Sequence, residues 1–168
     1  MTAVLFLLST AVPLRAAGFS AGISAGAISF NSDALDSNII DDRVDLFSAG
    51  INFKKETIPL CFFADCLLDF SKDGSDILSA AEFSFDYYIA SPVFSGTYLH
   101  YFYGPEFAAG FYGTYFADAG FCGGLSCFTS YNVEVFIKAS VRAGLEFTNC
   151  NPSLNLAIPV KGGIKYYF

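Results

Sequence analysis

The stretch that decides the fold closes the chain: LNLAIPVKGGIKYYF, residues 154–168. Large apolar side chains recur at every second position from Leu154 to Phe168 except at Gly162, and Lys161 and Lys165 lie at the positions between them. Successive side chains point to opposite faces in a strand, whereas a helix would spread the second set around its circumference. The stretch therefore predicts a β-strand with one apolar face.

The same two-residue period continues through earlier segments, so eight strands are expected. Segment 133–147 is as regular as the last one, with Val141 on its apolar face and Arg142 on the other. The remaining expected strands span residues 19–27, 44–53, 58–70, 77–90, 93–103 and 107–121. Connections are expected at residues 31–42, 54–56, 71–76, 91–92, 104–106, 122–131 and 148–153. A transmembrane helix over 87–105 is the alternative there, but Pro92, Gly96 and many aromatic residues disfavour it.

The composition indicates that much of this protein does not face water. The 168 residues are 54% hydrophobic, with a mean hydropathy of +0.47, yet no run approaches the ~20 apolar residues of a membrane-spanning helix. The charged fraction of 15% is below the ~25% usual for soluble domains. A net charge of −7 argues against a nucleic-acid partner, because phosphate binding needs a basic face.

The two faces of the expected strands differ in a way that points to lipid. One face carries long Phe, Leu and Ile side chains, while the other carries Gly, Ser and charged residues that cannot form a dry core. If the apolar face meets lipid, only a closed barrel satisfies the backbone hydrogen bonds. The predicted fold is all-β: a closed antiparallel eight-stranded up-and-down transmembrane β-barrel over residues 18–168. An even strand number puts both ends of the barrel chain on one side, expected to be the periplasm.

Residues 1–17 are typical of a secretory signal peptide. A short apolar run from Val4 to Leu14 is followed by Arg15 and small residues, so cleavage is expected near Ala16 or Ala17. The run lacks a preceding Lys or Arg, and a retained anchor or a first buried strand is the alternative. The expected location of the exported protein is the outer membrane of a double-membraned bacterium.

The inward face predicts a charge network in the barrel lumen. Acidic residues lie on the third and fourth strands and basic residues on the seventh and eighth, which lie across the ring from them. The expected members are Asp65, Asp69, Glu82, Asp86, Lys138, Arg142, Lys161 and Lys165. The network either fills the lumen as paired charges or sets the selectivity of a narrow pore.

The cysteines and the single histidine give little indication of catalysis or metal binding. Cys61 and Cys66 are five apart on one expected strand and cannot pair, whereas Cys122 and Cys127 lie in an expected connection and could form a disulfide. His100 with a serine such as Ser95 could serve a lipid A-modifying enzyme, but no nucleophile motif supports it. No enzyme activity, cofactor or metal site is expected.

Both ends of the barrel region resemble a known family. The Gly-rich alternating stretch FSAGISAG, residues 19–26, and the aromatic C-terminal residue resemble the small eight-stranded outer-membrane barrels of OmpA-barrel, OmpX and OmpW type. The resemblance implies that Ile164, Tyr166 and Phe168 form the signal read by the outer-membrane assembly machinery. It also implies contact with outer-membrane lipid and periplasmic chaperones, and it leaves a monomeric state open.

Three functional hypotheses follow from these features. The first is a small porin-like or hydrophobic-solute channel. The second is a non-conducting structural or surface-interaction barrel with a salt-bridged lumen. The third, more remote, is the lipid A-modifying barrel enzyme.

Overall fold

The computed structural model describes residues 18–32, 43–55, 58–69, 78–87, 89–93, 98–130, 132–148 and 151–168. The predicted signal peptide, residues 1–17, lies outside them. The strands are β1 (Phe19–Ser32), β2 (Arg43–Lys55), β3 (Leu60–Leu68), β4 (Leu78–Tyr87), β5 (Ile89–Pro92), β6 (Leu99–Tyr112), β7 (Tyr115–Ser130), β8 (Val133–Thr148) and β9 (Asn151–Tyr167). Within this part of the chain, no helix is long and apolar enough to cross a membrane.

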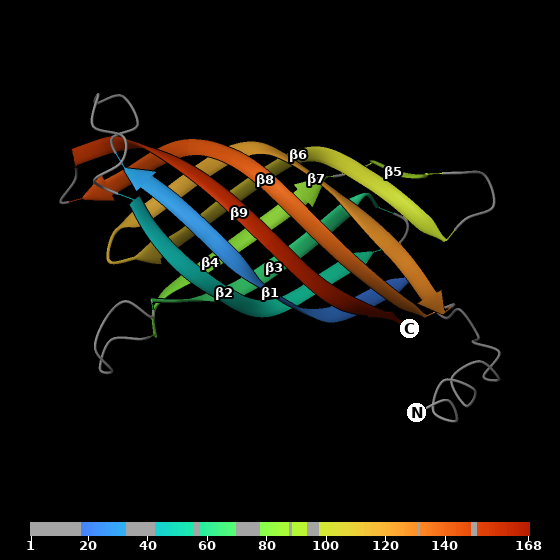
Figure 1. The fold of residues 1–168 in the computed structure, drawn as a ribbon. Helices are drawn as coiled ribbons and strands as arrows, with labels where there is room; N and C mark the ends of the chain where they lie inside the picture. The colour runs from blue at the N-terminus through green and yellow to red at the C-terminus, as the bar shows by residue number, and fades with distance from the viewer. Residues whose placement is uncertain are drawn as a thin grey trace.

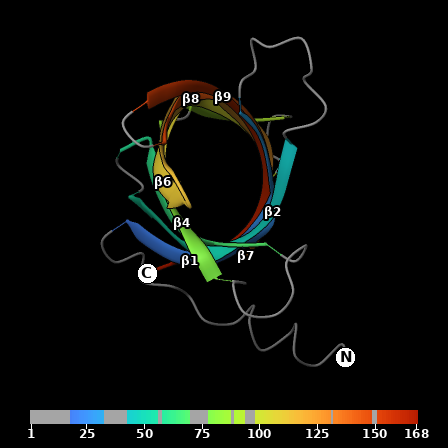
Figure 2. The same cartoon turned by 90° about the vertical axis from the view of Figure 1, so that its left-hand side faces the viewer.

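The strands form one closed antiparallel barrel. Strands that follow one another in sequence pair, except that β4 and β5 both pair with β6, and β1 also pairs with β9, which closes the ring (Figures 1 and 2). Because β4 and β5 keep a common register against β6, they form one barrel strand, so the described part of the chain makes eight strands. The predicted fold is confirmed. We call the end where β1 begins and β9 ends the terminal end, and the opposite end the far end.

The strands are apolar outside and polar inside, as the two-residue period predicts. Ile23, Phe83 and Phe121 point outward and are 65%, 65% and 72% exposed. On the inner face, Lys138 and Arg142 are 1% and 0% exposed. This distribution is the reverse of a soluble domain, in which large apolar side chains are buried and unpaired charges stay in water.

The predicted connection at Gly104–Glu106 is wrong, because these residues continue β6. Gly and Pro together usually mark a turn. Here Pro105 pairs with Phe121 of β7, so the strand continues through it. Proline has no N–H to donate to a ladder, which is why it is uncommon inside a sheet and why a turn was predicted.

The predicted connection at residues 122–131 is also wrong, because Cys122 to Ser130 belong to β7. The turn between β6 and β7 instead lies at Gly113 and Thr114, where Gly113 has a φ of 86°. Phe111 pairs with Tyr115 across this turn, and both are at odd positions. The apolar period therefore runs through the turn without a change of phase, and periodicity could not reveal it. The predicted connection at residues 91–92 likewise belongs to β5.

Glycines on the inner face let the backbones of neighbouring strands approach closely beside the buried basic residues. The register places a glycine directly opposite each of the four buried basic residues: Gly124 opposite Lys138, Gly120 opposite Arg142, Gly26 opposite Lys161 and Gly22 opposite Lys165. A Cβ at Gly26, for example, would lie 2.7 Å from the Cα of Lys161. Glycine is therefore needed at these positions for close approach rather than for a turn.

The adjacent pair Gly123 and Gly124 provides a test of this arrangement. A Cβ at Gly124 would lie 2.2 Å from the carbonyl oxygen of Ile137 and 2.5 Å from Cζ of Phe102, whereas the nearest atom to a Cβ at Gly123 is 3.7 Å away. Gly124→Val is expected to lower the free energy of unfolding by about 1–3 kcal/mol through overpacking. Gly123→Val, the matched control, should change it by less than about 0.5 kcal/mol. Equal effects in urea titrations of the two variants would contradict the assigned faces.

Candidate functional site in the barrel interior

An ion-pair network crosses the middle of the barrel interior, with Arg142 of β8 at its centre. Its Nη2 lies 2.6 Å from Oε2 of Glu82 on β4, and its Nη1 lies 3.1 Å from Oε1 of Glu106 on β6. Its Nε is 3.9 Å from Oδ2 of Asp118 on β7. Since all these side chains are buried, their charges are neutralised by one another rather than by solvent.

Lys161 of β9 continues the network toward β3. Its Nζ lies 2.6 Å from Oδ2 of Asp65 and 2.7 Å from Oε1 of Glu82. The hydroxyl of Ser24 donates a second hydrogen bond to Asp65, at 3.3 Å. Glu82 therefore accepts from both Lys161 and Arg142, and the last strand of the chain is tied across the interior to β3 and β4.

Lys138 of β8 forms the other arm of the network. Its Nζ lies 2.8 Å from Oδ2 of Asp86 and 3.4 Å from Oε1 of Glu106. Ser140 also donates a hydrogen bond to Glu106. Because Lys138, Arg142 and Lys161 each bridge two carboxylates, the arms join into one continuous network.

Six of the eight predicted lumen residues lie in this network: Asp65, Glu82, Asp86, Lys138, Arg142 and Lys161. The structure places the other two elsewhere. Asp69 is buried one residue beyond the end of β3. Lys165 lies nearer the terminal end, with its Nζ 3.8 Å from Oε2 of Glu134, which also accepts a hydrogen bond from the Tyr167 hydroxyl.

The sequence analysis missed Glu106 because it assigned this residue to a connection. Glu106 lies at an even position, in phase with the inward-facing Phe102 and Ala108. Continuing the two-residue period through Gly104 and Pro105 would have found it. Asp118 lies at an even position of β7 and is buried on the inner face, but its place beside Arg142 depends on the register of β7 and β8.

Aromatic rings line the terminal side of the network. Phe63, Phe102 and Phe136 form a buried cluster with Cys61. The ammonium of Lys138 lies 4.2 Å from the ring centroid of Phe63. The same distance separates Lys165 from the ring of Phe136. The lysines are thus held between carboxylates and the negative faces of aromatic rings, both of which favour a buried cation.

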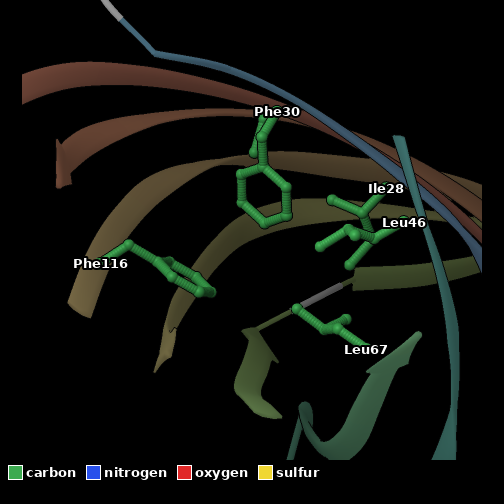
Figure 3. Close-up of a cluster of buried hydrophobic side chains, with 6 residues drawn as sticks. Ile28, Phe30, Leu46, Leu67 and Phe116 are labelled. Carbon is green, nitrogen blue, oxygen red and sulfur yellow. The ribbon is translucent and has the colours of Figure 1, made fainter. Parts of the chain in front are cut away.

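An apolar cluster fills the far side of the network. The late part of β1 contributes Ile28 and Phe30, and the start of β2, the end of β3 and the start of β7 contribute Leu46, Leu67 and Phe116. Figure 3 shows these side chains pointing toward one another inside the curved wall. The sequence analysis missed this cluster, because at this end large apolar residues also occupy the inner face.

A polar strip of the inner wall lacks protein partners. The Ser48 hydroxyl and both amide atoms of Asn52, on β2, are fully buried and form no hydrogen bond with the described residues. Their partners on β1 are small, with Gly26 paired to Ser48 and Gly22 to Asn52. Buried polar groups of this kind usually bind water.

The structure contradicts the predicted disulfide between Cys122 and Cys127. Both residues lie in β7, and residues five apart on a strand face opposite sides about 16 Å apart, far beyond the Cα separation of roughly 4–7 Å that a disulfide allows. Both are free, with Cys122 buried on the inner face and Cys127 partly exposed.

One group of metal-ligating type occurs within the described part of the chain. Possible ligand atoms of Asp86, Glu106 and Cys122 all lie within 4.8 Å of one another. However, Lys138 already contacts both oxygens of Asp86, at 3.0 and 2.8 Å. The lysine thus occupies the position that a metal cation would take, and the group fits a structural ion pair better than a metal centre.

His100 faces the interior at the terminal end. The register pairs it with Ser126 of β7, and its ring meets the edge of Phe128 at a centroid distance of 5.6 Å. No described carboxylate forms an ion pair or hydrogen bond with His100, and Ser95 lies outside the described residues. The geometry gives the lipid A-modifying hypothesis no support.

The predicted assembly signal lies at the seam of the barrel. Ile164 and Tyr166 pair with Ile23 and Ala21 of β1, and the N–H of Phe168 donates to the carbonyl oxygen of Phe19 at 2.9 Å. Ile164, Tyr166 and Phe168 all point outward and are exposed. Recognition of these residues by the assembly machinery stays a prediction.

Comparison with known proteins places this fold. No protein-family model and no curated protein matches the chain. Among solved structures, Neisserial surface protein A (NspA) superposes with a TM-score of 0.59 at 15% identity, covering 90% of this chain and 97% of that one. The chain has the fold of the small eight-stranded outer-membrane barrels. Ail, the attachment invasion locus protein of Yersinia pestis, aligns with a TM-score of 0.35 at 11% identity, covering 88% of this chain and 98% of that one.

Proposed function

We propose that this chain is an integral outer-membrane protein. The support is the outer surface of the strands, where Asp45 and Lys55 are the charged residues among the exposed described side chains. They lie ten positions apart near the two ends of β2. At ~3.3 Å per residue and a tilt of about 40°, that spacing corresponds to a height of about 25 Å, the usual thickness of the apolar band of an outer-membrane barrel.

We further propose that the barrel does not conduct, so that its interior is a structural core and its function lies in membrane structure or surface contact. The observation that carries this proposal is the network around Arg142, whose members span the interior and are almost completely buried. The apolar cluster of Ile28 and Phe30 on one side and the aromatic cluster of Phe63 on the other add two further layers. An eight-stranded barrel is just wide enough for side chains to fill it.

Single-channel recording in planar bilayers tests the non-conducting barrel. The purified protein, checked for folding by its shift in gel mobility on boiling, is expected to give no conductance steps. The double variant Lys138→Ala/Arg142→Ala removes two bridging cations, so that the remaining carboxylates repel and water enters. It is expected to give cation-selective steps. Val141→Ala, on the outer face, is the control and should give no conductance steps. Regular steps from the unmodified protein would contradict the proposal.

A narrow channel is the second candidate, and one observation favours it. Ser48 and Asn52 form a fully buried polar strip on β2 with no hydrogen-bond partner among the described side chains and backbone, and such a strip can hold a file of water. The same recordings distinguish the candidates, because a water file that conducts ions would give steps that Asn52→Leu abolishes.

A further inference from the structure

A shallow apolar groove lies on the outer surface at the terminal end, over the turn between β2 and β3. Its volume is about 280 Å³, and its lining includes Phe19, Phe53, Ile58, Phe62 and the side chains of Lys54 and Lys55. Two backbone hydrogen bonds shape the turn, from the N–H of Ile58 to Lys55 at 3.2 Å and from the N–H of Leu60 to Ile58 at 2.7 Å.

The register explains why the surface is hollowed here. Phe19, Lys55 and Leu60 form one row across β1, β2 and β3, while Ala21, Phe53 and Phe62 form the next row on the outer face. Since Ala21 is small, the rings of Phe53 and Phe62 stand above it. The result is an apolar floor with an ammonium group at its terminal edge.

Lys55 differs from the lysines of the interior in having no described carboxylate partner. Its side chain is exposed, and its Nζ lies 5.5 Å from the ring centroid of Phe19. Lys138 and Lys161, in contrast, each contact two carboxylates. The chain has a net charge of −7, and this cation lies at one edge of the apolar band that Asp45 and Lys55 bound, at the height where lipid headgroups begin.

We propose that the groove binds an anionic phospholipid of the leaflet at the terminal end. The ammonium of Lys55 contacts the phosphate, and one acyl chain lies against Phe53, Ile58 and Phe62. The charge selects an anionic over a zwitterionic headgroup, while the apolar floor supplies affinity for either. This inference rests on the proposed membrane location.

Native mass spectrometry of the detergent-purified full chain tests the site. The probe is an equimolar mixture of phosphatidylglycerol and phosphatidylcholine with identical acyl chains. One lysine near a charged membrane surface contributes about 1 kcal/mol, so the protein is expected to retain phosphatidylglycerol about fivefold over phosphatidylcholine. Lys55→Gln should bring this ratio to about one. Phe62→Ala should lower retention of both lipids and leave the ratio unchanged.

Lys72→Gln is the matched control, because Lys72 falls in the sequence between Leu68 and Leu78, the residues at which β3 and β4 meet the far end. It removes the same charge and should keep the fivefold ratio. A ratio of one for the unmodified protein, or an unchanged ratio in Lys55→Gln, would overturn the lipid site. Gel mobility on boiling is measured on the same samples. Loss of that shift in the unmodified protein would overturn the membrane barrel itself, and the lipid site with it.

Discussion

Replacing Arg142 by methionine is expected to lower the free energy of unfolding by about 3–5 kcal/mol, the usual cost of removing one partner from a buried ion pair. Arg142 contacts Glu82 at 2.6 Å and Glu106 at 3.1 Å, and all three side chains are fully buried. Methionine has a volume comparable to that of arginine, so the substitution removes the charge and its ion pairs while keeping most of the packing. Urea titration in detergent, followed by gel mobility because the chain has no tryptophan, measures the change.

A second substitution separates lost pairing from lost packing. In the Arg142→Met background, Glu106 keeps, of its described ion pairs, only the longer one to Lys138, at 3.4 Å, so Glu106→Gln is expected to restore part of the stability. Glu82 keeps Lys161 at 2.7 Å, so Glu82→Gln should restore less. Lys55→Met, which removes an exposed charge, is the control and should shift the free energy of unfolding by less than about 0.5 kcal/mol. A loss below about 1 kcal/mol in Arg142→Met would show that solvent reaches the network.

Which residues face inward could be predicted from the sequence, because alternation is a local property of a strand. The same alternation made the turn at Gly113 and Thr114 impossible to detect. Phe111 and Tyr115 pair across this turn and are both at odd positions, so the alternation continues through it unchanged. Pro105 caused the opposite error, because a connection was predicted where the strand β6 continues. Its place inside β6 depends on the pairing of that strand with β7, which no local pattern contains.

The composition of the network was partly predictable, but its pairing was not. Opposite charges on opposite walls could be expected once the strand order was known. That Lys161 bridges Asp65 and Glu82, whereas Lys165 lies beside Glu134, depends on the stagger of β9 against β1 and β8. The offset of each strand relative to its neighbour adds up around a barrel, and the total offset is fixed only when the first and last strands pair. The apolar cluster at the far end was missed for a different reason, because large apolar residues occupy both faces of the strands there and the two-residue period does not separate the faces.

An arginine at Val141 is expected to lower the free energy of unfolding in lipid by about 2–4 kcal/mol, because it would place a charge at the middle of the bilayer. Val141 is 57% exposed near the middle of β8. Val135, on the same strand and face, is the matched control. It lies six positions, or about 15 Å in height, toward the terminal end, so Val135→Arg should cost only about 0–1 kcal/mol. In a protein surrounded by water, both exposed sites would tolerate arginine within about 0.5 kcal/mol. Both variants are measured by urea titration of the barrel folded into lipid vesicles. If the two substitutions change the free energy of unfolding by equal and small amounts, the apolar outer surface faces water and the membrane location is contradicted.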